Sequence, residues 1–86
     1  MRIRFTKHAR ERMAERGIPD DHIEQAIEFP DKIGRSVFNH ARFVVKKIYF
    51  NAHLAKKYLL MVIYEEKGSE VLVTTIIDTS KIDKYF

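Results

Sequence analysis

The sequence predicts an α+β domain in which an N-terminal helical hairpin, after a short strand, packs on a small antiparallel β-sheet meander. Apolar residues recur at helical spacing in the first third of the chain, and β-branched and aromatic residues dominate the second half. A glycine-containing turn divides that second half into strands. The chain has 86 residues, 45% of them hydrophobic, which fits a single domain over residues 1–86 with one core.

The first third contains a strand and two helices. Arg2 to Phe5 can form the short strand, and Thr6 is a suitable N-cap for a helix over Lys7 to Arg16. Gly17 is placed to end this helix. Asp20 is expected to cap a second helix, because Pro19 stands just before it.

The second helix has one apolar face and a clear end. Ile23, Ala26 and Ile27 follow the i, i+3, i+4 spacing of a buried face, and Phe29-Pro30 stops the helix. Residues 30–39 are expected to form a loop or a short strand, with Gly34 at a turn.

The second half predicts three longer strands, with a hairpin turn over residues 66–69 between the last two. Residues 58–64 are apolar at both alternating sets of positions, which is typical of a central strand buried on both faces. The tail after residue 79 has room for one helical turn. The expected strands are Arg42–Phe50, Lys57–Glu65 and Glu70–Asp78.

Composition excludes several classes. The chain has no cysteine, so it has no disulfide framework and no thiolate metal site, which suits a reducing cytoplasm. We expect no signal peptide, because the first twelve residues carry charges where its apolar region would be, and the longest apolar run, residues 58–64, is too short to cross a membrane. We therefore expect a cytoplasmic protein. Residues 32–64 carry seven basic side chains and no acidic one. This stretch is either a face that attracts polyanions or an acidic partner, or a solvated lysine surface.

The first helix carries a basic stripe. His8, Arg12 and Arg16 are spaced i, i+4, i+8 and lie beside the apolar pair Ala9 and Met13. Three roles fit this stripe. The arginines can pair with acidic residues of the next segment, such as Asp20, Glu28 or Asp31, or they can bind phosphate. Alternatively, His8 can act as a general acid or base beside arginines that stabilise a phosphorane.

A second basic group lies in the strand over residues 42–50. Lys46 and Lys47 point to opposite faces, and Lys47 shares its face with Tyr49. A lysine beside an aromatic ring on a sheet is a workable RNA surface. The alternative is that these charges protect an edge strand from aggregation.

Other catalytic chemistries find little support. None of the four histidines has a partner at metal-ligand spacing, and neither a phosphate-cradling glycine loop nor a nucleophile elbow is present. We expect no metal and no cofactor. A metal-independent ribonuclease remains compatible, because the substrate supplies its own 2′-OH as nucleophile and the protein needs only an acid, a base and positive charge.

The segment from Phe5 to Ile18, FTKHARERMAERGI, followed by a helix closing in Phe29-Pro30-Asp31, resembles a family of small prokaryotic domains of unassigned function. The strands over residues 59–64 and 71–77 and the closing TSKIDKY over residues 79–85 match its second half. This family looks related to BrnT-type toxins and, more distantly, to the RelE/ParE toxin superfamily.

The resemblance implies a RelE/ParE-like fold and a toxin of a type II toxin–antitoxin system that cleaves mRNA, either free or on the ribosome, and is neutralised by a small acidic antitoxin. The matching positions are His8, Arg12 and Arg16, which would act on the RNA, and Lys81 and Tyr85, which would help Lys46, Lys47 and Tyr49 to bind it. Two alternatives remain: a non-catalytic nucleic-acid- or protein-binding module of the same fold, and a gyrase-inhibiting toxin of the ParE kind.

Overall fold

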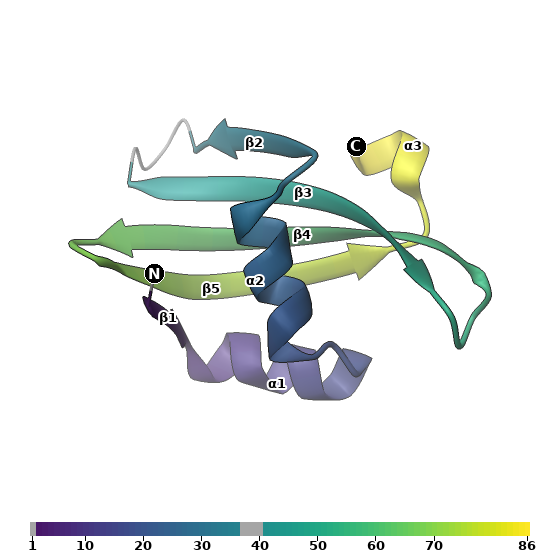
Figure 1. The fold of residues 1–86 in the computed structure, drawn as a ribbon, viewed down its shortest axis with the longest axis horizontal. Coiled ribbons are helices and arrows are strands. Elements are labelled where there is room, and N and C mark those ends of the chain that lie inside the picture. Colours follow the sequence, from purple (N-terminus) through teal and green to yellow (C-terminus); the bar gives the residue numbers. More distant parts are fainter. Residues whose placement is uncertain (1, 37–40) are drawn as a thin grey trace.

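The computed structural model describes residues 2–36 and 41–86 (Figure 1). In chain order its elements are β1 (Arg2–Phe5), α1 (Lys7–Arg16), α2 (Asp20–Glu28), β2 (Lys32–Arg35), β3 (Arg42–Asn51), β4 (Lys56–Lys67), β5 (Glu70–Thr79) and α3 (Ile82–Tyr85).

The bounds of α1 follow from its two caps. The hydroxyl of Thr6 accepts a hydrogen bond from the backbone N–H of Ala9, 3.2 Å away. At the other end, Gly17 adopts a left-handed φ of 64°, and the backbone N–H of Ile18 donates to the carbonyl of Met13 at 2.9 Å. The predicted helix over residues 7–16 is confirmed, with both of its caps.

The N-cap of the second helix lies one residue earlier than expected. Pro19 occupies the N-cap position, and Asp20 is the first helical residue. The prediction that Asp20 is the cap is therefore wrong: its carboxylate instead accepts a hydrogen bond from Arg10 at 2.7 Å. The predicted buried face is confirmed, since Ile23, Ala26 and Ile27 are buried.

Five strands of the described ranges form one sheet in the order β1-β5-β4-β3-β2. Strands β2 to β5 form an antiparallel meander as predicted. The sheet as a whole is mixed, because β1 pairs parallel to β5. The expectation of a purely antiparallel sheet is thus wrong. The pairing places Ile3 beside Val71 and Phe5 beside Val73, so the apolar side of β1 extends the apolar side of β5.

The segment after α2 resolves the choice between loop and strand. Residues 32–35 form the outer strand β2, so Gly34 lies within a strand and the predicted turn there is wrong. The rest of that predicted segment, residues 37–39, and His40 lie outside the described residues.

The two helices pack on different strands. Helix α1 lies against β5 and β1, whereas α2 crosses β4 and β3 (Figure 1). Each helix buries its apolar stripe on the sheet, and the buried Ile18 anchors the connection between them. The predicted helical hairpin, as a pair of helices packed on one another, is therefore not confirmed.

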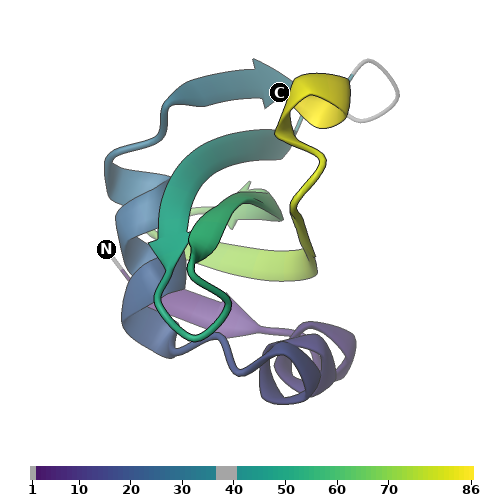
Figure 2. The ribbon, with the colours of Figure 1, turned by 90° about the vertical axis from the view of Figure 1, so that its right-hand side faces the viewer.

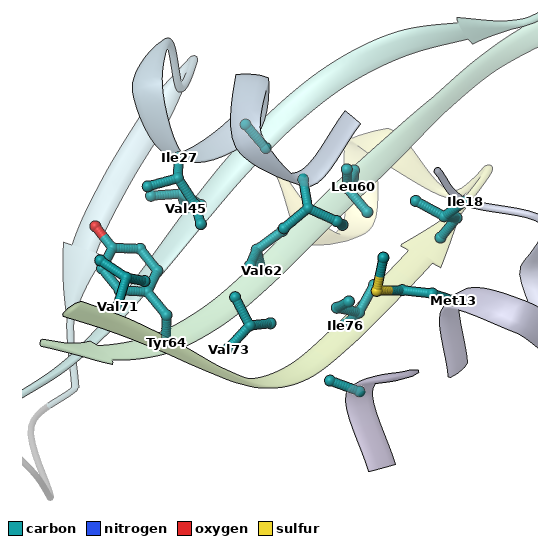
Figure 3. Close-up of a cluster of buried hydrophobic side chains, with 13 residues drawn as sticks. Met13, Ile18, Ile27, Val45, Leu60, Val62, Tyr64, Val71, Val73 and Ile76 are labelled. Atoms are coloured by element: carbon teal, nitrogen blue, oxygen red, sulfur yellow. The ribbon is translucent and has the colours of Figure 1, made fainter. Parts of the chain in front are cut away.

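Most of the core lies between the sheet and these two helices (Figure 3). Strand β4 is central: Leu60 faces the helices, and its neighbour Leu59 is just as completely buried on the other face. Helix α3 lies on that other face, opposite α2 (Figure 2). The predicted double-sided burial of β4 and the helical turn in the tail are confirmed. In the described part of the chain, no helix has the length and apolar character needed to cross a membrane.

Candidate functional site

Polar side chains gather at one end of the helix-bearing face of the sheet. There the end of α1, the start of α2 and the connection between β3 and β4 surround a cavity of about 580 Å³. We call this cavity the α1–α2 pocket. Its lining residues are Arg16, Gly17, Ile18, His22, Tyr49, Phe50, Asn51, Ala52, His53 and Leu54.

An ion pair joins this pocket to the last strand. The Nε of Arg16 lies 3.4 Å from Oδ1 of Asp78. Asp78 pairs in register with Leu60 of β4, so its side chain lies on the face that the helices cover. The Asp78 side chain is only 8% exposed, whereas that of Arg16 is 49% exposed. The guanidinium therefore bridges a buried carboxylate and the open pocket.

The rings of Tyr49 and His22 both line the pocket, and the ring of Tyr58 adjoins that of Tyr49. The ring of Tyr49 lies 5.6 Å from that of His22 and 6.2 Å from that of Tyr58. Burial, and next the negative charge of Asp78, raise the pKa of Tyr49, while the Asn51 side chain acts in the opposite direction. The phenol consequently keeps its proton at neutral pH, and it can donate a hydrogen bond or a proton but cannot act as a base.

Two imidazoles reach the pocket from separate elements. His22 lies in the first turns of α2, and His53 lies in the turn that joins β3 to β4. The side chain of Asn51 accepts a hydrogen bond from the backbone N–H of Leu54 at 3.1 Å, which holds that turn. Imidazole is the side chain that enzymes use most often as a general acid or base.

The predicted stripe on α1 does not converge on this pocket. Arg16 lines it, but His8 lies two turns earlier on the exposed surface of the helix. At a rise of about 1.5 Å per residue, the backbones of these two residues are roughly 12 Å apart. Arg12 forms an ion pair within its own helix, with Glu15 at 3.7 Å. Of the residues predicted to be catalytic, the pocket thus includes only Arg16.

The residues predicted to bind RNA divide between the two faces of the sheet. Lys47 shares the helix-bearing face with Tyr49, as expected, and donates to the backbone carbonyl of Phe29 at 2.8 Å. Lys46 points to the opposite face and donates to the carbonyl of Tyr85 at 2.6 Å. Lys81 and the ring of Tyr85 are exposed beside α3, on that opposite face. These residues do not form one continuous surface.

The basic stretch of residues 32–64 is dispersed in the same way. Lys32 lies over the ring of Phe86 on the α3 side, while Arg35 lies over the ring of Phe43 on the helix-bearing side. Arg42 forms a hydrogen-bonded ion pair with Glu65 at 2.8 Å. These basic side chains therefore do not lie on a single face that could bind a polyanion.

Sequence reasoning identified Arg16 and Tyr49 but interpreted His22 and His53 as isolated and did not single out Asp78. A signal for His22 was available: the short 17–19 connection must hold Arg16 and His22 at the same end of the sheet. Within residues 2–36 and 41–86, no group of three or more His, Asp or Glu side chains is arranged to hold a metal ion. The arrangement supplies a cation, a phenol and two imidazoles around one cavity, which are the groups that bind and transfer protons at a phosphate ester.

No curated protein and no solved structure matches the chain. One family model does match, over residues 5–81, and it carries the description Domain of unknown function (DUF4258). Because this match spans nearly the whole sequence, from β1 to the residue before α3, the chain belongs to the DUF4258 family.

Proposed function

We propose that the protein is a metal-independent endoribonuclease that acts on mRNA, as the toxin-like component of a type II toxin–antitoxin system. The observation that carries this proposal is the convergence of Arg16, His22, Tyr49 and His53 on the α1–α2 pocket. The active site is thus proposed at the pocket rather than along the His8–Arg12–Arg16 stripe.

The chemistry needs no group beyond those of the pocket and the RNA. The ribose 2′-oxygen attacks the adjacent phosphorus, and the bond from phosphorus to the 5′-oxygen breaks, which yields a 2′,3′-cyclic phosphate and a 5′-hydroxyl. One of His22 and His53 accepts the proton of the 2′-OH, and the other donates a proton to the leaving oxygen. Arg16 stabilises the charge that develops on the phosphorane oxygens, and Tyr49 donates a hydrogen bond.

The cellular role rests on the sequence resemblance to BrnT-type and RelE/ParE toxins. The fold supports this resemblance in its order of elements, two helices followed by an antiparallel meander, while the parallel β1 makes the sheet mixed. The proposed setting is the cytoplasm, with RNA as substrate, ribosome-bound mRNA included, and a small acidic antitoxin as partner. Expression of the chain alone should arrest bacterial growth, and co-expression of an acidic antitoxin, which the proposal expects to be encoded beside it, should restore growth.

The direct test is cleavage of a single-stranded RNA by purified protein in the presence of EDTA, with and without ribosomes. The expected product ends in a 2′,3′-cyclic phosphate. His22→Ala, His53→Ala and Arg16→Ala should each abolish cleavage, whereas Glu11→Gln, a change on the exposed surface of α1, should not. If His8→Ala abolishes cleavage while His22→Ala does not, the site is the α1 stripe. If the wild type leaves RNA intact in every condition, the nuclease proposal fails.

The second candidate is a non-catalytic binding module. Two exposed apolar side chains support it. Phe50 and Leu54, which also line the pocket, are 62% and 56% exposed. Large exposed apolar side chains are typical of binding surfaces. Such a module would bind its partner with equal affinity after His22→Ala, and Phe50→Ala would weaken that binding. A gyrase inhibitor differs again, because DNA supercoiling would fail while RNA stayed intact.

A further inference from the structure

Asp78 is a half-buried residue whose carboxylate is mostly covered and has a defined partner. Its side chain is 8% exposed, at the end of β5 and on the face that the helices cover. A charged group at this depth is costly unless an opposite charge compensates it. The compensating charge is Arg16, the last residue of α1, 3.4 Å away.

Besides contacting Asp78, Arg16 lines the α1–α2 pocket. The ion pair engages its Nε, and one carboxylate can accept only part of the N–H donors of a guanidinium. The remaining donors keep the planar fork that matches a phosphate group. Asp78 therefore stands behind Arg16, while a ligand would approach from the pocket in front.

We propose that Asp78 is a positioning residue of this site, which orients the guanidinium of Arg16 so that it can receive a phosphodiester of single-stranded RNA. The inference rests on the proposed function for the identity of the ligand. Two features support the orienting role. Arg16 ends a helix that Gly17 terminates, so its long side chain needs an anchor, and β5 provides that anchor through Asp78. The negative charge of the same carboxylate also raises the pKa of Tyr49, another residue that lines the pocket.

The alternative role of Asp78 is to compete with RNA for the charge of Arg16. A carboxylate that merely neutralises Arg16 lowers the positive potential of the pocket, and its removal would strengthen RNA binding. A carboxylate that orients Arg16 weakens RNA binding when it is removed, although the protein then carries one more net positive charge. The sign of the change therefore separates the two roles.

The experiment combines one measurement without ligand and one with it. The first follows the Nε–Hε resonance of Arg16 by NMR in the wild type, in Asp78→Asn and in Asp78→Glu. The second measures the affinity for a 2′-O-methylated single-stranded RNA oligonucleotide, which cannot be cleaved. Glu11→Gln is the matched control, because it removes the same charge from the exposed surface of α1.

We expect Asp78→Asn to shift the Arg16 Hε resonance and to speed its exchange with water. We also expect it to reduce RNA affinity about tenfold, which is the effect of losing roughly one hydrogen bond to a charged group. In an Arg16→Ala background, Asp78→Asn should have no further effect, because the two residues act as one unit. Glu11→Gln should leave both readouts unchanged. Asp78→Glu keeps the charge but moves the carboxylate, so it should give a smaller loss of affinity, and it serves as the test if Asp78→Asn does not fold.

Three results would overturn the proposal: an unchanged Arg16 Hε resonance in Asp78→Asn, a gain in RNA affinity, or additive losses in the double variant. A wild-type protein that does not bind the oligonucleotide contradicts the proposed function instead. The NMR arm still decides in that case whether Asp78 holds Arg16.

Discussion

Lys47 of β3 donates from Nζ to the backbone carbonyl of Phe29, 2.8 Å away, at the C-terminal end of α2. The last carbonyls of a helix have no partner within the helix and carry partial negative charge, so a lysine there is favourable. The same ammonium lies 3.9 Å from Asp31. Lys47 thus connects the sheet to the end of α2, and this contact gives it a role in the fold.

Lys47→Met is expected to destabilise the protein by about 1 kcal/mol, because it removes a charged donor from a helix end while it keeps the apolar stem. Urea unfolding followed by circular dichroism measures this change. Lys57→Met, at an exposed position of β4, is the control and should be close to neutral. A variant that kept its stability and lost RNA affinity would indicate that Lys47 serves RNA binding after all.

The local elements of this fold are readable from the sequence because local interactions determine them. Thr6 and Gly17 bound α1 through contacts within a few residues, and the alternation in β3 separates Lys46 from Lys47. The parallel pairing of β1 with β5 joins Ile3 to Val71 and depends on the whole topology. Gly34 resembled a turn residue, yet its pairing with Val44 holds it in a strand.

The candidate site was only partly readable for the same reason. Arg16 and His22 are close in the chain, but Tyr49 and His53 reach the pocket from β3 and the following turn, and Asp78 of β5 contacts Arg16. A single sequence gives no measure of such distances. The stripe on α1 was correct as a helical pattern, but it could not indicate that the pocket lies at only one end of the helix.

A second prediction concerns the stability that the central strand β4 contributes. Leu59 and Leu60 are both buried, on opposite faces of the sheet, so Leu59→Ala and Leu60→Ala should each cost about 2–5 kcal/mol. Leu54→Ala, at a position that is 56% exposed, should cost far less. Thermal or urea unfolding of the three variants provides the comparison. A small effect of Leu59→Ala would show that the α3 side of the sheet is not a true second core.

A third prediction concerns Gly17, the residue in the left-handed conformation at the end of α1. Gly17 has a φ of 64°, which costs a residue with a Cβ about 1–2 kcal/mol, so Gly17→Ala should destabilise the protein by roughly that amount. Gly34 is the matched control: it lies in β2 without a positive φ, and an added Cβ would meet nothing within 4 Å. Gly34→Ala should therefore be neutral or slightly stabilising. Equal losses of stability in the two variants would contradict this assignment.

The pair formed by Arg42 and Glu65 makes stability depend on acidity. The hydrogen bond from Arg42, 2.8 Å long, lowers the pKa of Glu65 below its ordinary value of 4.5; burial opposes this shift, and the charges of Arg42 and Lys67 add to it. The folded state therefore favours the carboxylate. Its contribution to stability is present above pH 4.5 and is lost as the pH falls through the lower pKa of the folded state.

Glu65→Gln should thus be less stable than the wild type at neutral pH, and the difference in unfolding free energy should close on acidification. Urea unfolding from pH 7 to about pH 3 measures the gap, with Glu11→Gln as control. A gap that stays constant with pH would mean that the Glu65 charge contributes nothing through this pair.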